Sequence, residues 1–415
     1  MEASNFFAHM KAITPQPVED LFFRWFQDPS PYKVNLIIGA YRTDEEKPYV
    51  FEAVKESERR ILSNSNLNKE YIQSSGLDIF NKSSCAILLG KTCPAIIEKR
   101  VATFQTLSGS GSLRIGLEFL KTHINPPAVY VSDPSWNNYS LLVNQVGLPL
   151  IKYPYWNKLR GELDFDGIIN CLQSALEGSV VILQVCAQNP TGVDPTLMQW
   201  DRIEQIVKEK KLIPFFDTAY LGWSSGDYED DAYIVRKFVN NDIQCLISQS
   251  FSKCMGLYGE RVGALHVVCS NQETAEIVHT NILPIVYTMY LSPPLHGARI
   301  VANILSDDEL IKQWKNELKF VIQRLKDMRI RLVEELTALN TPGDWSYIVN
   351  GIGMFSNLQI TPEQCSSLSD KYHCYVLNTG RISICGINTK NIKYVAKSIK
   401  AVVEPQKEDI LMGLS

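Results

Sequence analysis

The chain has 415 residues, of which 45% are hydrophobic and 21% are charged, with a formal net charge of −4. This composition is ordinary for a globular protein, and the length predicts one large domain or two unequal ones. The small negative charge gives no reason to expect nucleic acid or an anionic membrane as a partner. The ten cysteines show no C-x-x-C pair or zinc spacing, which favours a reduced compartment over a disulfide framework.

The N-terminal residues 1–11 contain an early acid and no arginine. They therefore differ from an Arg-rich, acid-poor mitochondrial transit peptide, and they lack the apolar core of a signal peptide. No apolar run approaches the ~20 residues that a membrane span needs. We expect a cytoplasmic protein with no membrane partner.

Short apolar runs alternate with helix-like stretches through the centre of the chain. The strand-like runs cover residues 128–131, 180–185, 212–216, 245–248 and 262–268. Helical patterns lie between them, for example over 200–209. This alternation predicts an α/β fold with a mainly parallel sheet covered on both faces.

The C-terminal third shows apolar residues every three or four positions from Leu310 to Leu336. This spacing predicts one long amphipathic helix that Pro342 and Gly343 end. A helix of ~30 residues would reach roughly 45 Å, long enough to link two domains. A final helix is predicted near 392–403.

Polar residues follow three of the predicted strands directly. Asn189 follows the run 180–185, Asp217 ends the run 212–216, and Lys253 follows the run 245–248. In open α/β sheets, ligands bind at the edge where such strands end.

Together with Tyr220 and Arg261, these residues suit pyridoxal 5'-phosphate. Lys253 offers the amine for a Schiff base with the cofactor aldehyde. Asp217 offers the carboxylate that keeps the ring nitrogen protonated, so that the ring works as an electron sink. Tyr220 and Asn189 can donate hydrogen bonds to the phenolate oxygen of the ring.

The cofactor phosphate needs a cation and several N–H or O–H donors. Arg261, Ser250 and Ser252 meet this need near Lys253. A second set of donors stands in the small-residue run 108–112, before the helical run that starts at Leu113. Small residues that open a helix leave backbone N–H groups free for an anion. The predicted donors of this run are Ser108, Gly109 and Ser110.

Several segments resemble aspartate aminotransferases of fold type I, and the likeness is closest to the animal cytosolic branch. It runs from about residue 30 to about residue 400, in the family's order. The segments are 34–44, 189–194, 215–220, 250–263, 292–299 and 380–383. The resemblance implies a homodimer in which a large cofactor-binding domain has a mainly parallel seven-stranded sheet. It assigns 49–321 to that domain, 15–48 and 322–415 to a smaller α+β domain, and 1–14 to an N-terminal arm.

The resemblance also implies roles for four further residues. Trp136 stacks on the cofactor ring, and Tyr71 reaches the phosphate of the neighbouring subunit's cofactor. Arg381 clamps the substrate α-carboxylate, and Gly39 belongs to a mobile segment that covers the substrate. Without the resemblance, the two aromatic residues are core side chains, Arg381 is a surface arginine and Gly39 is an ordinary turn residue.

The activity implied is transamination between an amino acid, L-aspartate by family, and 2-oxoglutarate. One departure bears on this substrate. Where aspartate-specific members carry a second arginine for the side-chain carboxylate, this chain has Tyr287, and no arginine stands between Arg261 and Arg299. Leu291 replaces the serine of the same segment. Lys11 or Lys33 could supply the missing cation.

Histidines of the family that support the aspartate at the ring nitrogen are replaced by Tyr139, Gln184 and Gln188. Two alternatives to aspartate transamination therefore stay open. The first is an aminotransferase for neutral or aromatic amino acids. The second is a weakly active paralogue with a binding role. Against it argues the joint retention of Lys253, Asp217, Tyr220, Arg261 and Arg381.

Overall fold

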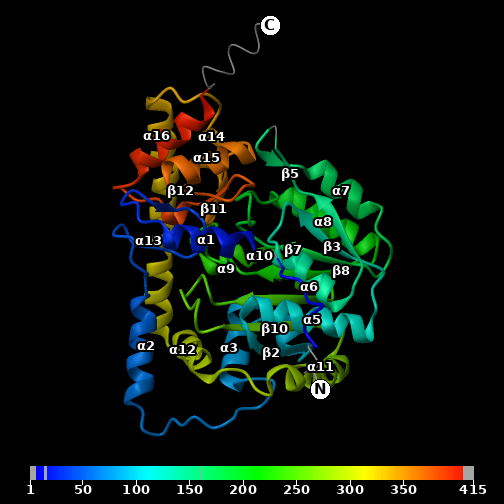
Figure 1. Ribbon diagram of the computed structural model, residues 1–415. Helices are drawn as coiled ribbons and strands as arrows, with labels where there is room; N and C mark the ends of the chain where they lie inside the picture. The colour runs from blue at the N-terminus through cyan, green and yellow to red at the C-terminus, as the bar shows by residue number, and fades with distance from the viewer. Residues whose placement is uncertain (1–5, 14–15, 159, 405–415) are drawn as a thin grey trace, which may run out of the picture.

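The computed structural model describes residues 6–13, 16–158 and 160–404, and its centre is a seven-stranded sheet (Figure 1). The strand order is β2-β10-β9-β8-β7-β3-β4. β10 runs antiparallel to both of its neighbours, and the other pairs are parallel. The strands are Val101–Leu107 (β2), Val129–Asp133 (β3), Leu150–Pro154 (β4), Val180–Gln184 (β7), Ile213–Thr218 (β8), Cys245–Ser250 (β9) and Val262–Val268 (β10).

Apolar side chains alternate between the two faces of this sheet. In β8, Phe215 joins the core on one face and the adjacent Phe216 joins the core on the other. In β7, Ile182 and Leu183 divide in the same way. Successive residues of a strand point to opposite faces, so a run that is apolar throughout fits a strand buried on both sides.

Helices cover both faces of the sheet. On one face lie Ser108–His123 (α5), Asn138–Val146 (α6) and Gln272–Tyr290 (α11). On the other lie Asp78–Leu89 (α3), Phe165–Gln173 (α7), Leu197–Glu209 (α8), Tyr233–Asn240 (α10) and Leu295–Ser306 (α12). The remaining helices near the sheet are Glu52–Ser63 (α2), Pro94–Ile97 (α4) and Tyr228–Asp231 (α9).

A second, smaller α+β region lies beside the sheet, at the top left of Figure 1. Two short ladders hold it together: β1 pairs parallel with β12, and β11 pairs antiparallel with β13. Its strands are Val34–Asn35 (β1), Phe355–Asn357 (β11), Cys374–Tyr375 (β12) and Arg381–Ser383 (β13). Its helices are Pro17–Gln27 (α1), Ser346–Asn350 (α14), Pro362–Tyr372 (α15), Ile384–Gly386 (a 3-10 turn) and Ile392–Val403 (α16). A further small hairpin joins Trp156–Asn157 (β5) to Glu162–Leu163 (β6).

The long helix Asp308–Ala338 (α13) runs along both regions. Near its start, the Trp314 indole N–H donates to the carbonyl of Cys254, 2.6 Å away, in the loop that carries Lys253. Near its end, the buried Arg329 guanidinium donates to four carbonyls of the smaller region. One rigid element therefore contacts both sides of the cavity described below.

The predicted elements agree with the structure. The long helix, the final helix and the mainly parallel sheet are confirmed. One boundary differs, because α5 begins at Ser108 itself, so the small residues form the first turn of the helix and do not precede it. The division of the chain at residues 49 and 322 stays a prediction.

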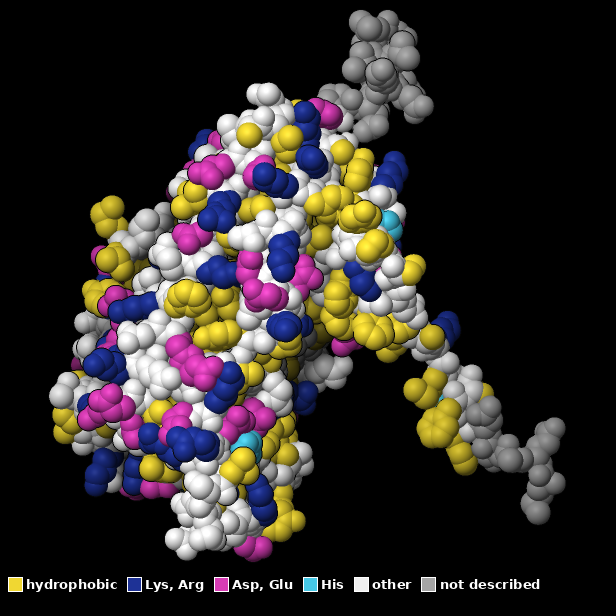
Figure 2. Space-filling model, turned by 90° about the vertical axis from the view of Figure 1, so that its left-hand side faces the viewer, with side chains coloured by type: hydrophobic (Ala, Val, Ile, Leu, Met, Phe, Trp, Pro, Cys, Tyr) yellow, Lys and Arg dark blue, Asp and Glu magenta, His cyan; other side chains and the backbone are white. Residues whose placement is uncertain are grey.

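Each of the ten cysteines is a free thiol. Within the described residues, no helix combines the length and the apolar character that crossing a membrane requires. Hydrophobic side chains also lie exposed on the segment 6–13, which projects from the body of the molecule (Figure 2).

Candidate active site

A cavity of about 730 Å³ opens beyond the ends of β7, β8 and β9, between the sheet and the smaller region. Residues from both regions line it, as the sequence predicted for a ligand at this edge of the sheet. Six of the predicted site residues are in its wall: Gly39, Trp136, Asn189, Tyr220, Lys253 and Arg381.

Lys253 lies in the turn after β9 and extends its amine into the cavity. The amine nitrogen is 5.3 Å from the centroid of the Tyr220 ring, close enough for a cation–π contact. Burial lowers the pKa of Lys253 below its usual value; the charge of Asp217 opposes this change and that of Arg261 adds to it. A lysine with a lowered pKa has more of the neutral amine that attacks an aldehyde.

Asp217 is near the end of β8 and is only 4% exposed. Its Oδ2 accepts a hydrogen bond of 2.5 Å from the Tyr139 hydroxyl. Its Oδ1 is buried and has no hydrogen-bond partner among the described residues. Burial raises the pKa of Asp217, although the hydrogen bond from Tyr139 and the charge of Lys253 both lower it.

A cluster of three serine hydroxyls adjoins Asp217 at the first turn of α5. The Ser108 hydroxyl oxygen is 2.8 Å from those of Ser250 and Ser252. Arg261 donates to the Ser252 hydroxyl at 3.2 Å and to the carbonyl of Tyr258 at 3.0 Å. No carboxylate within the described chain forms an ion pair with Arg261, so this group of donors lacks an anion.

The backbone at this cluster is strained and tightly packed. Ser108 and Arg261 have φ values of 59° and 51°, which are costly for residues other than glycine. A Cβ at Gly263 would lie 2.8 Å from the Cα of Ser108, so only glycine fits there. Such strain concentrates at sites where the chain must hold a set of donors in place.

Arg381 approaches the cavity from β13 and is only 7% exposed. Its guanidinium is 4.3 Å from the centroid of the Phe355 ring. It donates to the carbonyl of Ile37 at 2.6 Å and to the side-chain oxygen of Asn189 at 3.3 Å. Burial lowers its pKa to about 10, and its Nε has no partner in the described part of the molecule. Arg381 therefore keeps N–H donors for an acidic ligand.

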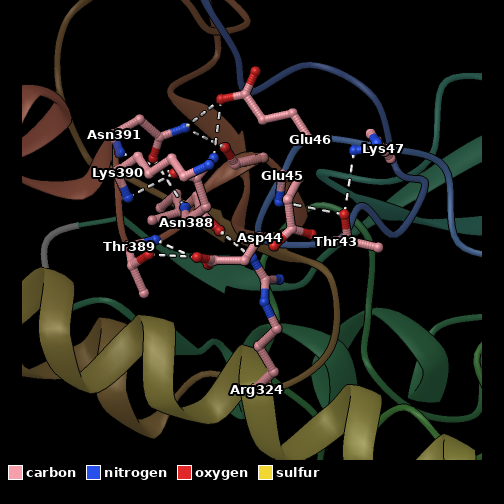
Figure 3. Close-up of polar contacts among 12 residues, drawn as sticks. Thr43, Asp44, Glu45, Glu46, Lys47, Arg324, Asn388, Thr389, Lys390 and Asn391 are labelled. Atoms are coloured by element: carbon pink, nitrogen blue, oxygen red, sulfur yellow. Dashed lines mark hydrogen bonds and ion pairs between the residues drawn. The ribbon is translucent and has the colours of Figure 1, made fainter.

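Gly39 closely approaches β11, since a Cβ there would lie 2.5 Å from the Phe355 ring. The segment that follows is held by a polar network (Figure 3). Asp44 accepts hydrogen bonds from the backbone and hydroxyl of Thr389, and it pairs with Arg324 of α13 at 3.3 Å. Burial opposes the ionisation of Asp44, but these contacts outweigh it and hold its pKa below the usual value. Glu46 accepts from Asn388 at 2.9 Å in the same network.

Two further residues with expected roles, Tyr71 and Tyr287, belong neither to this cavity wall nor to the serine cluster. Tyr71, between α2 and α3, is 81% exposed, so its side chain is not part of the core. Tyr287 on α11 is 61% exposed and lines a different cavity with Gln73 and Ser75. Lys33 does not supply the missing cation, because its amine donates to three carbonyls near the end of α1. Lys11 is exposed in the N-terminal segment and lies outside the cavity wall.

The three histidine replacements differ in what they contact. Only Tyr139 bonds to Asp217. Gln184 accepts from the backbone of Asn189 at 3.2 Å, and Gln188 donates to the carbonyl of Pro134 at 2.9 Å. Both glutamines therefore stabilise the turns around the cavity. Phe355 was missed by the sequence analysis, because an apolar residue in a short strand gives no signal of a role beside Arg381.

The residues fit pyridoxal phosphate on the evidence of their own contacts. The unpartnered Asp217 Oδ1 matches a protonated ring nitrogen, and the serine cluster with Arg261 matches a phosphate. Ser110 completes the first turn of α5, whose N-terminal N–H groups favour an anion. Lys253 lies between these groups and Arg381 in the wall of the cavity.

Comparisons with known proteins agree with this fit. The family profile described as "Aminotransferase class I and II" matches residues 31–399. Aspartate aminotransferase 1 of Medicago sativa is 45% identical over 97% of this chain and 96% of its own length. The structure of the aspartate aminotransferase from Saccharomyces cerevisiae cytoplasm superimposes with a TM-score of 0.95 at 38% identity, over 97% of this chain and 99% of that one.

A third relative is the aromatic-amino-acid aminotransferase of Burkholderia pseudomallei, solved with covalently bound pyridoxal phosphate. It superimposes with a TM-score of 0.94 at 35% identity and covers 97% of this chain and 100% of its own. The chain therefore belongs to the class I and II aminotransferases, and it is a pyridoxal-phosphate-dependent enzyme of fold type I.

Proposed function

We propose that this enzyme exchanges an amino group between L-aspartate and 2-oxoglutarate, giving oxaloacetate and L-glutamate. The observation that carries the proposal is the convergence of Lys253, Tyr220, Asn189 and Arg381 on one cavity above the buried Asp217. The Medicago and yeast relatives, both named aspartate aminotransferase, support the choice of substrate.

Pyridoxal phosphate supplies an aldehyde that accepts amino groups and a ring that accepts an electron pair. Trp136, in the cavity wall, would offer a face for that ring, and Asp217 would keep the ring nitrogen protonated. Tyr220 and Asn189 would offer donors for the ring oxygen. The phosphate would be bound by Ser108, Gly109, Ser110, Ser250, Ser252 and Arg261.

Lys253 has two roles in this proposal. Its amine anchors the cofactor, and once released it takes the proton from the substrate α-carbon as a general base. The lowered pKa of Lys253 suits this second role, because a base must be unprotonated to act. After accepting the proton, the same amine would donate it as a general acid to the former aldehyde carbon of the cofactor, and not back to the α-carbon.

Arg381 orients the substrate by binding its α-carboxylate through the N–H groups that remain unused. The Phe355 ring and the Ile37 carbonyl fix the plane of the guanidinium. Holding the substrate in one orientation places its α-hydrogen toward Lys253 and lowers the entropy cost of the reaction. Gly39 lies in the segment that would cover the bound substrate.

We further propose that the enzyme is a homodimer and acts in the cytoplasm, as the name of the yeast relative states for that protein. Tyr71 then contacts the cofactor phosphate of the neighbouring subunit, which accounts for its exposure in the single chain. The proposed partners are a second copy of the chain and small amino and 2-oxo acids.

A second candidate is transamination of neutral or aromatic amino acids. The specific observation in its favour is Tyr287, which stands where a cation would bind the side-chain carboxylate of aspartate. The named aromatic-amino-acid aminotransferase among the structural relatives is consistent with it.

A panel of amino donors with 2-oxoglutarate tests both candidates. We expect L-aspartate to yield L-glutamate and oxaloacetate, and Lys253→Ala to yield neither. A preference for phenylalanine or leucine over aspartate would favour the second candidate. Failure of every donor with the cofactor-loaded wild type would contradict aminotransferase activity itself.

A further inference from the structure

The hydrogen bond between Tyr139 and Asp217 is one of the shortest contacts of the site, at 2.5 Å. Tyr139 is 2% exposed, and its ring packs edge-on against Trp136, with centroids 5.5 Å apart and planes at 86°. The hydroxyl is therefore fixed in position. It occupies Oδ2 of the carboxylate and leaves the buried Oδ1 without a hydrogen-bond partner among the described residues.

This arrangement bears on where one proton resides. A carboxylate next to a pyridine nitrogen can keep its negative charge and leave the proton on the ring, or it can take the proton and leave both groups neutral. Burial favours the neutral pair, because it raises the pKa of Asp217. A donor on Oδ2 stabilises the charged carboxylate and so favours the protonated ring.

We propose that Tyr139 is a positioning residue that keeps the proton on the cofactor ring nitrogen by donating its hydroxyl hydrogen to Asp217 Oδ2. The inference rests on the proposed role of Asp217 toward the cofactor. It gives Tyr139 a function that acts through Asp217 and requires no contact of its own with the substrate.

The other groups around Asp217 do not replace this donor. Lys253 acts on the carboxylate through its charge and donates no hydrogen bond to it. Tyr220 and Cys186 are neutral, because burial raises the pKa of each. The Ser248 hydroxyl donates to the carbonyl of Gly109 at 3.3 Å, and it lowers the pKa of Asp217 less than Tyr139 does. Among the hydrogen-bond donors, Tyr139 therefore stabilises the charged carboxylate most.

The test measures the ring nitrogen directly. Pyridoxamine phosphate labelled with ¹⁵N in the ring is bound to the apoenzyme, and its resonance is recorded by solid-state NMR at one pH. We expect the wild type to show a protonated nitrogen and Tyr139→Phe to shift toward the neutral value. Tyr139→His, which restores an N–H donor, should bring the resonance back toward the wild-type position.

The matched control is Tyr153→Phe. Tyr153 is also 2% exposed, but its hydroxyl donates to the carbonyl of Ile182 at 3.1 Å and does not contact Asp217. This variant should keep the wild-type resonance and the wild-type affinity for pyridoxamine phosphate. Tyr139→Phe should bind the same ligand roughly tenfold more weakly, the factor expected for loss of one hydrogen bond to a charged group.

A ring nitrogen that stays protonated in Tyr139→Phe would overturn the inference and leave the proposed function intact. A wild type that binds no pyridoxamine phosphate would overturn both. If Tyr139→Phe does not fold, the Tyr139→His and Tyr139→Gln variants decide the matter, because both carry donors while differing in basicity. A neutral ring nitrogen in both of these folded variants would also overturn the inference.

Discussion

At the scale of single residues, the site contains two arginines that form no ion pair within the described chain. Arg381 is buried and Arg261 adjoins the serine cluster, yet neither is paired with a carboxylate in the described part of the chain. A buried charge without a partner of opposite charge is costly, unless a bound ligand supplies that partner. A substrate carboxylate and a cofactor phosphate are the two anions that the proposed function brings.

The third cation expected for aspartate is missing, and Tyr287 occupies its place in the sequence. A partly desolvated salt bridge of this kind is worth roughly 3–5 kcal/mol, judged from broken buried pairs. We therefore expect kcat/KM for aspartate to lie about two to three orders of magnitude below that of a family member with the arginine. Donors with apolar side chains should lose much less.

Tyr287→Arg should increase the preference for aspartate, measured as the ratio of kcat/KM for aspartate to that for phenylalanine. Thr288→Arg, one position further along α11, is the matched control and should leave the ratio unchanged. A wild type whose kcat/KM for aspartate equals that of a family member with the arginine, or no gain in Tyr287→Arg, would contradict this role of Tyr287.

At the scale of elements, α13 connects the loop of Lys253 with the wall that carries Arg381. Trp314 bonds to the loop, and Arg329 donates to the carbonyls of Ile348, Ile352, Gly353 and Phe355. Burial lowers the pKa of Arg329 to about 10, which leaves it charged at neutral pH. The carbonyls replace the water that this cation loses on folding.

Arg329→Met should therefore lower the free energy of unfolding by roughly 3–5 kcal/mol, because four buried carbonyls lose their donor. Denaturation by urea measures the change. Arg331→Met, at an exposed position of the same helix, is the control and should stay within about 0.5 kcal/mol of the wild type. Equal stability of the two variants would show that Arg329 does not hold the smaller region.

Strand β10 carries a buried histidine that predicts a pH dependence. The two ring nitrogens of His266 bond to Thr103 at 3.0 Å and to the Gln249 side-chain oxygen at 2.9 Å. Burial lowers the pKa of His266 to about 3. The unfolded chain binds a proton near pH 6.5 and the folded chain does not, so stability falls as the pH drops from about 6.5 toward 3.

Between pH 6.5 and pH 5 this residue should lower the free energy of unfolding by about 1.6 kcal/mol. His266→Gln cannot take up the proton, so its melting temperature should fall less than that of the wild type over this interval. His123→Gln removes an exposed histidine and serves as the control. Parallel melting curves for the wild type and His266→Gln would refute the assignment.

The elements also show what the sequence could and could not predict. Strand runs such as 180–185 were predictable because both faces are buried and the residues are apolar throughout. Contacts between distant segments were not: Phe355 beneath Arg381 and Ile37 beside it depend on tertiary packing. The sequence shows that Tyr139 replaces a histidine of the family, but only the structure shows its hydrogen bond to Asp217.

At the scale of the whole molecule, one surface has exposed aromatic residues without partners. Tyr71 and Tyr287 are 81% and 61% exposed, and the segments that carry them meet around the cavity lined by Gln73, Ser75 and Pro284. Figure 2 shows further hydrophobic side chains on the projecting N-terminal segment. An isolated chain would leave this apolar surface in water, which favours association with a second copy.

We therefore expect a two-fold symmetric dimer with two composite sites. Its mass measured by sedimentation should be twice that of the chain. Tyr71→Ala should weaken retention of the cofactor without abolishing the dimer, because the hydroxyl reaches only the phosphate. A monomer that transaminates at the wild-type rate would disprove the composite site.

The central claim is that this enzyme anchors pyridoxal phosphate on Lys253, and borohydride reduction tests it most directly. The loaded protein is reduced, digested and mapped by mass spectrometry. The cofactor should remain on the peptide that contains Lys253, and Lys253→Ala should retain no label and no visible absorbance of the bound cofactor. Label on any other lysine of the wild type, or a fully labelled Lys253→Ala variant, would contradict it.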